Sequence, residues 1–213
     1  MKLYIIRHGE TDMNKNAVLQ GQTNSELNGN GIMLAEMTGR AMKGIRFDSC
    51  ISSPLIRARN TAEIVLRESG NASTEIVEDD RIQEISFGVR EGTKLNPQGE
   101  DWNFWHAPFQ FAGFEGGESL AQLFRRTGEF LRELVSRDDG RTYLISTHGC
   151  ALRAMLNPLY DDPSNFWHHH APYNCSVSIV SAEEGRMELT ADDRVYYDEK
   201  YIVDRYHYQE NGS

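Results

Sequence analysis

A short apolar run near the start of the chain ends abruptly in charged and flexible residues. Leu3 to Ile6 has the length and composition of a buried strand, and Arg7-His8-Gly9 follows it directly. In open α/β sheets, ligands bind at the carboxyl ends of the strands. This junction therefore predicts an imidazole and a guanidinium in that crevice, beside a glycine at which the backbone can turn sharply.

A second junction of the same kind occurs near residue 50. Phe47 to Ser52 is typical of a short buried strand, and Ser52-Ser53-Pro54 then offers a capping hydroxyl followed by a proline at the first helical position. Arg57 lies in the opening turn of this predicted helix. The apolar positions of the helix share one face, so we expect Arg57 to point away from the core and toward the strand ends.

The third junction lies in the second half of the chain. Thr142 to Thr147 is predicted to form a strand that ends at His148-Gly149, and a helix then continues until Pro158. In a doubly wound sheet these three junctions converge on one point. The sequence therefore predicts an α/β fold: a doubly wound, three-layer sandwich with a mostly parallel central sheet and helices on both faces.

Convergence of these junctions would bring two arginines and two histidines together. Arginine offers forked donors that suit tetrahedral oxyanions, and a helix N-terminus adds backbone amides and a favourable dipole. Phosphate is the anion that such a pocket favours. The residues concerned are Arg7, His8, Arg57 and His148.

Further elements follow from the apolar periodicity of the chain. Helices are expected over Gly31 to Met42 and Ser119 to Val135, and another central strand over Ser176 to Val180. Hairpin strands are expected at Met187 to Leu189 and at Val195 to Tyr197. The polar tail that ends at Ser213 has the composition of a disordered terminus.

Composition limits the partners of the protein. A net charge of −10 over 213 residues would repel polynucleotides and anionic membranes, so we expect neither as a partner. We expect neither a signal peptide nor a membrane span, because the apolar run Leu3 to Ile6 is too short and carries no cleavage site. Cys50, Cys150 and Cys175 form an odd, scattered set that predicts reduced core thiols and a cytoplasmic protein, and a homodimer is compatible with these features.

One segment has the appearance of a metal-binding tract. His168-His169-His170 lies between Trp167 and Pro172, where we expect a native loop. Consecutive residues of a short helix beginning at Asp162-Pro163 would point in different directions, which is poor geometry for one tetrahedral metal site. The sequence predicts no metal and no cofactor.

Motif residues occur in five segments that span nearly the whole chain. They are Leu3 to Thr11 with Asn14, Gln20-Gly21, Leu27 and Gly31; Ser53 to Ala58 with Thr61-Ala62; Glu84 with Phe87-Gly88 and Glu91-Gly92; Gly116 to Ser119; and Thr147 to Gly149. In this order they resemble the histidine phosphatase superfamily, which also contains cofactor-dependent phosphoglycerate mutases. Two departures, Leu34 for a common glutamine and Arg90 for a usual tryptophan, are expected to affect packing or substrate shape more than chemistry.

The resemblance implies a mechanism for the predicted pocket. His8 would attack phosphorus in line, with its other ring nitrogen donating to a backbone carbonyl that fixes the tautomer. Arg7, Arg57 and His148 would neutralise the phosphoryl oxygens in the transition state. In the family an acid that matches Glu84 protonates the leaving alkoxide, and the same carboxylate then activates water.

The remaining assignments have competing explanations. The phosphate-binding set that we predict is Arg7, Asn14, Gly21, Gln22, Arg57 and His148. Asn14 and Gln22 are equally typical of loop and turn formers. Other carboxylates compete with Glu84 for the pocket, namely Glu10, Glu91, Glu100, Asp101 and Glu118.

One histidine phosphatase-like domain is expected over residues 1–213, with an aromatic-rich specificity insertion at about 94–117. The rings of this insertion are Trp102, Phe104, Trp105, Phe109, Phe111 and Phe114. They form either a satellite core that holds the insertion or a rim of exposed rings that binds the organic part of a phosphomonoester.

These observations predict a metal-independent phosphomonoesterase that hydrolyses a small phosphorylated metabolite through a phosphohistidine on His8. The alternative is a cofactor-dependent phosphoglycerate mutase, but Ile85 to Gly88 resembles the phosphatase branch more closely. A third possibility is a module that binds a phosphorylated ligand without turnover, which the intact set of basic and acidic residues disfavours.

Overall fold

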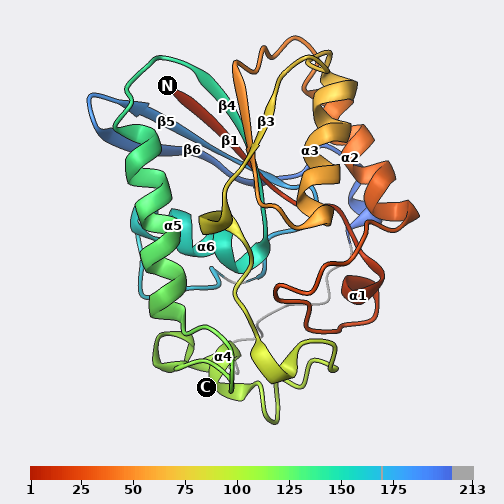
Figure 1. Cartoon of the computed structure of the whole chain (residues 1–213), viewed down its shortest axis with the longest axis vertical. Helices are drawn as coiled ribbons and strands as arrows, with labels where there is room; N and C mark the ends of the chain where they lie inside the picture. The colour runs from red at the N-terminus through yellow and green to blue at the C-terminus, as the bar shows by residue number, and fades with distance from the viewer. Residues whose placement is uncertain (169, 203–213) are drawn as a thin grey trace.

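A six-stranded central sheet organises residues 1–168 and 170–202, which are the part of the chain that the computed structural model describes. The strand order is β3-β2-β4-β1-β5-β6, and Figure 1 shows β1 in the middle of the molecule. The strands are β1 (Lys2–Arg7), β2 (Ser49–Ser52), β3 (Ile76–Glu78), β4 (Thr142–Thr147), β5 (Val177–Glu183) and β6 (Arg186–Arg194). Only β5 runs against the others in this part of the chain, because it pairs antiparallel with both β1 and β6.

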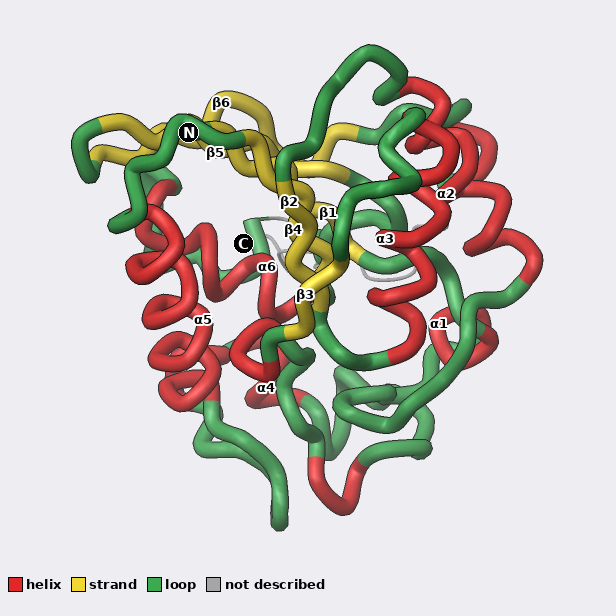
Figure 2. Tube along the Cα trace, turned by 45° about the horizontal axis from the view of Figure 1, so that its top comes forward, coloured by secondary structure: helices red, strands yellow, loops and turns green. Residues whose placement is uncertain are grey.

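Helices cover both faces of the sheet. The helices α2 (Gly29–Ala41) and α3 (Ile56–Ser69) lie on one side, and α5 (Leu120–Val135) and α6 (Gly149–Leu156) lie on the other (Figures 1 and 2). The alternation of β1 explains this arrangement. Leu3 and Ile5 belong to the core under α5 and α6, whereas Tyr4 and Ile6 belong to the core under α2 and α3. The predicted three-layer α/β fold is therefore confirmed.

Shorter elements connect these layers. They are the helices α1 (Asp12–Lys15) and α4 (Trp102–His106) and the 3-10 turns Asp80–Ile82, Gly88–Arg90, Pro108–Gln110, Asn157–Leu159 and Glu199–Tyr201. Within the described residues, no helix combines the length and the apolar character that a membrane crossing requires.

The start of α3 differs from the prediction. The helix begins at Ile56 and not at Pro54, and its N-cap residue Leu55 makes no side-chain capping bond. Asn24 supplies the cap from a distant loop, because its Oδ1 accepts from the Ile56 amide at 2.8 Å. Ser53, the expected cap, accepts from the Leu55 amide at 3.3 Å and contacts His148 instead.

Two further sequence-based predictions are wrong. The chain returns from β5 in one continuous strand, β6, so the predicted strand at Val195 to Tyr197 does not form. Turns occupy the segment after Asp162-Pro163 in place of the predicted short helix. The predicted disordered tail lies outside the described residues.

The aromatic insertion packs as a third core below the sheet. Its buried residues join those of α5 and α6; the rings in this cluster are Phe87, Phe104, Trp105, Phe111, Phe166 and Trp167. Arg90 fastens the insertion, since its guanidinium lies 3.1 Å from the buried carboxylate of Asp101 and 5.9 Å from the centre of the Phe114 ring. The departure from the family pattern at Arg90 therefore concerns packing, and the same holds for Leu34, which is buried in α2.

The loop after β1 packs directly against the backbone of α2. A Cβ at Gly9 would lie 2.7 Å from the carbonyl oxygen of Gly31, and a Cβ at Gly31 would collide with the backbone of Glu10. Side chains at these positions would therefore push the loop that carries His8 away from the helix.

We expect Gly31→Ala to destabilise the protein by about 1 to 3 kcal/mol, the usual cost of overpacking, and to lower any activity that depends on His8. Gly29→Ala is the control in the same helix, because a Cβ there meets nothing within 4 Å. Chemical denaturation of both variants measures the difference. Equal stability of the two variants would show that the close approach has no energetic consequence.

Candidate active site

His8 lies just beyond the C-terminal end of β1, where the backbone holds it tightly. Its amide donates to the Thr147 carbonyl at 2.9 Å, and its own carbonyl accepts from Asn174 Nδ2 at 2.9 Å. The ring Nδ1 lies 2.7 Å from the Gly9 carbonyl oxygen, which can only accept, so Nδ1 carries the proton. This is the tautomer predicted from the sequence, and it leaves the lone pair on Nε2.

Burial and the charges of two arginines keep the His8 ring neutral. Burial lowers its pKa well below the ordinary value, and the charges of Arg57 and Arg7 lower it further. The Arg57 Nε–H group donates to His8 Nε2 at 3.3 Å. Nε2 is therefore an unprotonated nitrogen that faces a cation, which are the properties required of a nucleophile toward phosphate.

Arg57 is fully buried, so it is not an exposed charge on the helix surface. It points at the strand ends, as expected. Its Nη2 donates to the Gly21 carbonyl at 2.7 Å, and its Nη1 donates to the Thr23 carbonyl at 2.8 Å. Burial lowers the pKa of Arg57 to about 10, so the group remains charged at neutral pH. The loop that accepts these bonds turns at Gly21, whose φ is +52°.

Arg7 and His148 complete the basic cluster. Arg7 Nη1 donates to the Pro172 carbonyl, and both side chains are nearly or completely buried. The His148 ring lies 5.1 Å from the His8 ring between centroids, and its Nε2 shares a 2.8 Å hydrogen bond with Ser53 Oγ. Burial lowers the pKa of His148 well below its ordinary value. His148 is not among the described residues that line the pocket.

The carboxylate of Glu84 lies at the N-terminal end of α6 and faces this basic cluster. Its carboxylate accepts from the amides of Ile85, Cys150 and Ala151 at 3.0, 3.2 and 3.1 Å, respectively. A helix N-terminus favours a negative group at this position. Among the carboxylates of residues 1–168 and 170–202, Glu84 alone lines the pocket.

The competing carboxylates are engaged elsewhere. Glu10 accepts from Asn28 at 2.8 Å. Glu91 accepts from the Gln22 amide and from the Thr23 hydroxyl. Glu100 and Asp101 pair with Arg90, and Glu118 pairs with Arg126.

The predicted neutral donors divide into two groups. Asn14 and Gln20 line the pocket. Asn14 Oδ1 accepts from the Thr11 amide and Gln20 Oε1 accepts from the Thr11 hydroxyl, which leaves both side-chain amide nitrogens without a bond to another described residue. Gly21 also lines the pocket, but its carbonyl serves Arg57. Gln22 is exposed outside the pocket, and its Nε2 donates to the Glu84 carbonyl at 3.2 Å.

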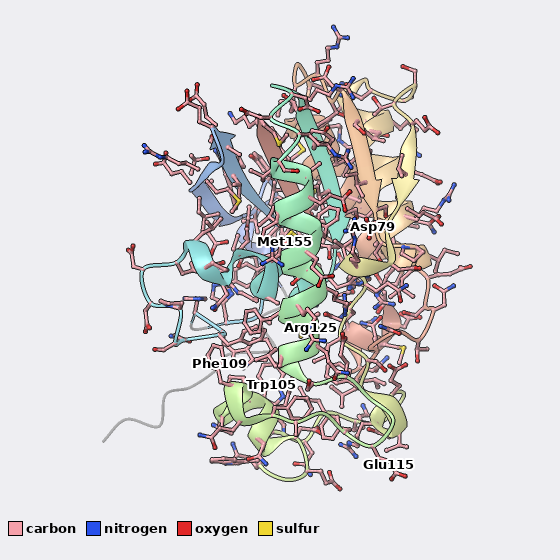
Figure 3. All side chains as sticks on the ribbon, turned by 60° about the vertical axis from the view of Figure 1, so that its left-hand side comes forward. Asp79, Trp105, Phe109, Glu115, Arg125 and Met155 are labelled. Carbon is pink, nitrogen blue, oxygen red and sulfur yellow. The ribbon has the colours of Figure 1, made fainter. Side chains whose placement is uncertain are left out.

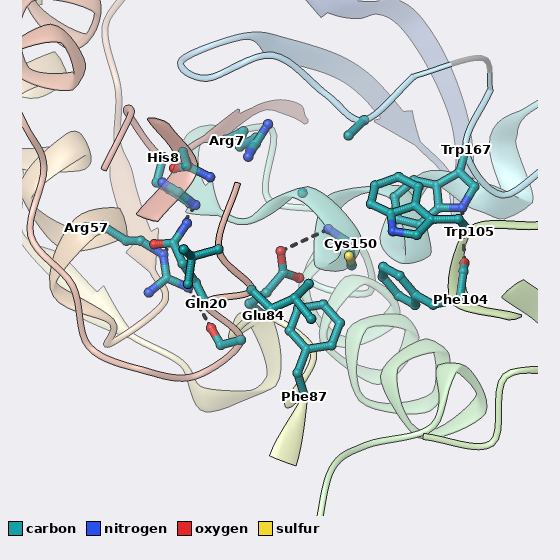
Figure 4. Close-up of a pocket in the computed structure, with 16 residues that line it drawn as sticks. Arg7, His8, Gln20, Arg57, Glu84, Phe87, Phe104, Trp105, Cys150 and Trp167 are labelled. Atoms are coloured by element: carbon teal, nitrogen blue, oxygen red, sulfur yellow. Dashed lines mark hydrogen bonds between the residues drawn. The ribbon is translucent and has the colours of Figure 1, made fainter. Parts of the chain in front are cut away.

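These side chains surround one pocket of about 540 Å³, including the space that opens to solvent. Figure 4 shows Arg7, His8 and Arg57 at one end, Glu84 and Cys150 in the middle, and Phe104, Trp105 and Trp167 at the other end. Of the six insertion rings, only Phe104 and Trp105 line the pocket, and both are buried. Phe87 and Trp167 also belong to this wall, which the sequence did not predict.

The exposed rings of the insertion do not line the pocket. Trp102 and Phe109 are about half exposed, and Figure 3 shows Phe109 with Trp105 near the N-terminal end of α5. Of the two alternatives for the insertion, the structure therefore favours the satellite core, because the rings that line the pocket are buried. Buried rings form the wall because the insertion packs its own core against α5 and α6.

Comparison with known proteins decides the family. A sequence model of the histidine phosphatase superfamily (branch 1) matches residues 3–192. The chain belongs to this superfamily.

Similar proteins of the superfamily cover almost the same length. The chain is 28% identical over 190 residues to the "Probable phosphoglycerate mutase GpmB" of Salmonella choleraesuis, and the match covers 87% of each protein. The structure of YhfR from Bacillus stearothermophilus is 30% identical, with a TM-score of 0.82, and the match covers 91% of this chain and 97% of YhfR.

A phosphoserine phosphatase from Entamoeba histolytica, solved with phosphoserine, is 29% identical and has a TM-score of 0.74, with 89% and 95% of the two chains covered. The relatives thus include proteins named as mutases and as phosphatases. The superfamily assignment supports an enzyme of one of these two kinds.

One further arginine holds the segment that carries Glu84. Arg126 of α5 donates to the carbonyls of Arg81, Gln83 and Glu84 at 2.8, 2.7 and 2.9 Å, respectively. Glu118 balances its charge through contacts of 2.7 and 2.8 Å. This clamp fixes the backbone at Glu84 without a contact to the pocket, so Arg126 is a positioning residue.

The two buried histidines predict a stability that depends on pH. Because both rings have a lowered pKa in the folded protein, the unfolded chain binds more protons below about pH 6.5. We expect the free energy of unfolding to fall as the pH drops below that value, by up to about 1.4 kcal/mol per pH unit for each histidine. Urea denaturation between about pH 5 and pH 7 measures this slope.

His148→Asn should remove the share of His148 from that slope, since asparagine does not titrate. The comparison of the two slopes cancels the carboxylates that both proteins contain. Identical slopes for wild type and variant would contradict a neutral, buried His148.

Proposed function

We propose that the protein is a metal-independent phosphomonoesterase that works through a phosphohistidine on His8. The observation that carries this proposal is the lone pair of His8 Nε2, which faces Arg57 while Nδ1–H is bound to Gly9. Glu84 is the carboxylate that lines the same pocket. A nucleophile, a cation and an acid on one small cavity are the parts needed for two-step phosphoryl transfer.

The first step transfers the phosphoryl group to the enzyme. His8 Nε2 forms a bond to phosphorus while the bond from phosphorus to the ester oxygen breaks, and the leaving oxygen takes the proton of Glu84. Arg7 and Arg57 bind the phosphoryl oxygens, and the amide nitrogens of Asn14 and Gln20 add neutral donors.

The second step releases phosphate. Water attacks phosphorus, the bond to His8 Nε2 breaks, and the Glu84 carboxylate accepts a proton from the water. The charge that a metal ion supplies in other phosphatases comes here from the two guanidinium groups. Three free, buried cysteines support a reducing, cytoplasmic setting for this activity.

A mutase makes a further demand on the pocket. It must hold a second anionic group of the same molecule while the first is transferred. Among the described residues that line the pocket, the cationic or potentially cationic ones are Arg7, His8 and Arg57, and all three lie at the same end. This distribution favours hydrolysis over the mutase alternative.

The central test is the covalent intermediate. With a phosphomonoester and EDTA present throughout, we expect rapid quench in alkali to trap phosphate on His8, because phosphohistidine survives alkali better than acid. Mass spectrometry locates the adduct. His8→Ala should abolish it, while phosphate on another residue, or an activity that EDTA removes and a metal ion restores, would refute the proposal.

The role of Glu84 can be tested by changing the leaving group. Glu84→Gln should lower turnover of an alkyl phosphate by about a hundredfold or more, the usual span of general acid catalysis. The loss should be smaller for p-nitrophenyl phosphate, whose leaving group needs little protonation. Single-turnover phosphorylation rates for both substrates measure this difference.

Glu100→Gln is the matched control, because the Glu100 side chain is 66% exposed and pairs with Arg90 outside the pocket. It should leave both rates unchanged. An equal loss on both substrates in Glu84→Gln would mean that another group protonates the leaving oxygen.

A further inference from the structure

The end of the pocket opposite His8 is a packed aromatic wall. Trp105 of α4 stacks on Trp167, with ring centroids 4.5 Å apart and planes 21° apart. Phe104 meets the Trp167 ring edge to face at 5.2 Å, and the Trp167 indole N–H donates to the Phe104 carbonyl at 3.4 Å. The rings are therefore already in place before any ligand binds.

The same wall carries no charge. Apart from the basic cluster, Glu84, Asn14, Gln20 and two glycines, the described pocket residues have apolar or thiol side chains: Val18, Leu19, Phe87, Phe104, Trp105, Cys150, Trp167 and Ala171. Burial raises the pKa of the Cys150 thiol well above its ordinary value, so this group is also neutral. A carboxylate or second phosphate placed here would lose its water without gaining a cation.

Glu84 lies between the basic cluster and this wall (Figure 4). A phosphoryl group against His8 therefore places the ester oxygen near the carboxylate and directs the organic group toward the rings. Arg90 and the fully buried Asp101 hold the insertion at the start of α4, which keeps Trp105 at the pocket.

We infer that the substrate is a phosphomonoester of an uncharged, apolar alcohol or phenol that carries a ring, bound between the aromatic wall and Glu84. This inference rests on the proposed phosphatase function and adds the class of the leaving group. It sets such esters apart from substrates that carry a carboxylate or a second phosphate, because the wall favours burial of an apolar ring and penalises an unpaired charge.

The first experiment compares alkyl esters with similar leaving-group chemistry. The wild-type protein is assayed with 2-phenylethyl phosphate, ethyl phosphate, glycerol 1-phosphate and 3-phosphoglycerate. We expect kcat/KM to be about tenfold to a hundredfold higher for 2-phenylethyl phosphate than for ethyl phosphate, the gain that burial of one phenyl ring gives. A preference for 3-phosphoglycerate, or equal values for the two alkyl esters, would overturn the inference.

The second experiment removes one ring of the wall. Trp105→Ala should lower kcat/KM for 2-phenylethyl phosphate by about tenfold and should affect ethyl phosphate much less. Trp102→Ala is the control, because Trp102 belongs to the same helix but is 47% exposed and lies outside the pocket lining. Trp105→Leu, which keeps apolar bulk, replaces the alanine variant if the latter does not fold. Equal losses on both esters would overturn the inference.

Acetyl phosphate separates this inference from the proposed function. Its small leaving group needs neither the acid nor the wall, so it should phosphorylate His8 in wild type and in Trp102→Ala alike. Phosphorylated His8 without a preference for the phenyl ester would refute the inference alone. Failure to form phosphohistidine from any of these esters or from acetyl phosphate would refute the phosphatase proposal itself.

Discussion

The buried guanidinium of Arg57 is the interaction on which the arrangement of the pocket depends. Removal of a cation from water is costly unless its hydrogen bonds are replaced. Arg57 obtains that replacement from the carbonyls of Gly21 and Thr23 and from His8 Nε2. One charge therefore joins the first helix turn of α3, the loop after α1 and the end of β1. The same contacts of Arg57 therefore position the loop and keep His8 Nε2 unprotonated.

Much of this arrangement could be predicted from local sequence. The junction at Arg7-His8-Gly9 and the strand Thr142–Thr147 were recognisable because each combines a buried apolar run with an abrupt change to basic or flexible residues. Parallel strands then bring their carboxyl ends together, whatever their distance along the chain. The apolar periodicity of α5 was equally clear, although its cap at Ser119 was not predicted.

The rest depended on contacts between distant segments. The helix α3 begins at Ile56 because Asn24 caps it across 32 positions, and the local serines gave the wrong start. Glu84 could not be separated from its rivals until the backbone amides of α6 and the clamp of Arg126 were known. Trp167 gave no local signal, since its place in the pocket wall depends on contacts with Trp105 and Phe104 of the distant insertion.

The central position of β1 has a consequence for the order of folding. The first strand of the chain pairs with β4 on one side and with β5 on the other, so both of its neighbours are synthesised more than a hundred residues later. During synthesis, the apolar segment Leu3 to Ile6 therefore stays unpaired until most of the protein has left the ribosome. Such segments are prone to aggregation and place heavy demands on chaperones. The strand that positions His8 is thus also a segment that stays exposed to aggregation for most of the synthesis of the chain.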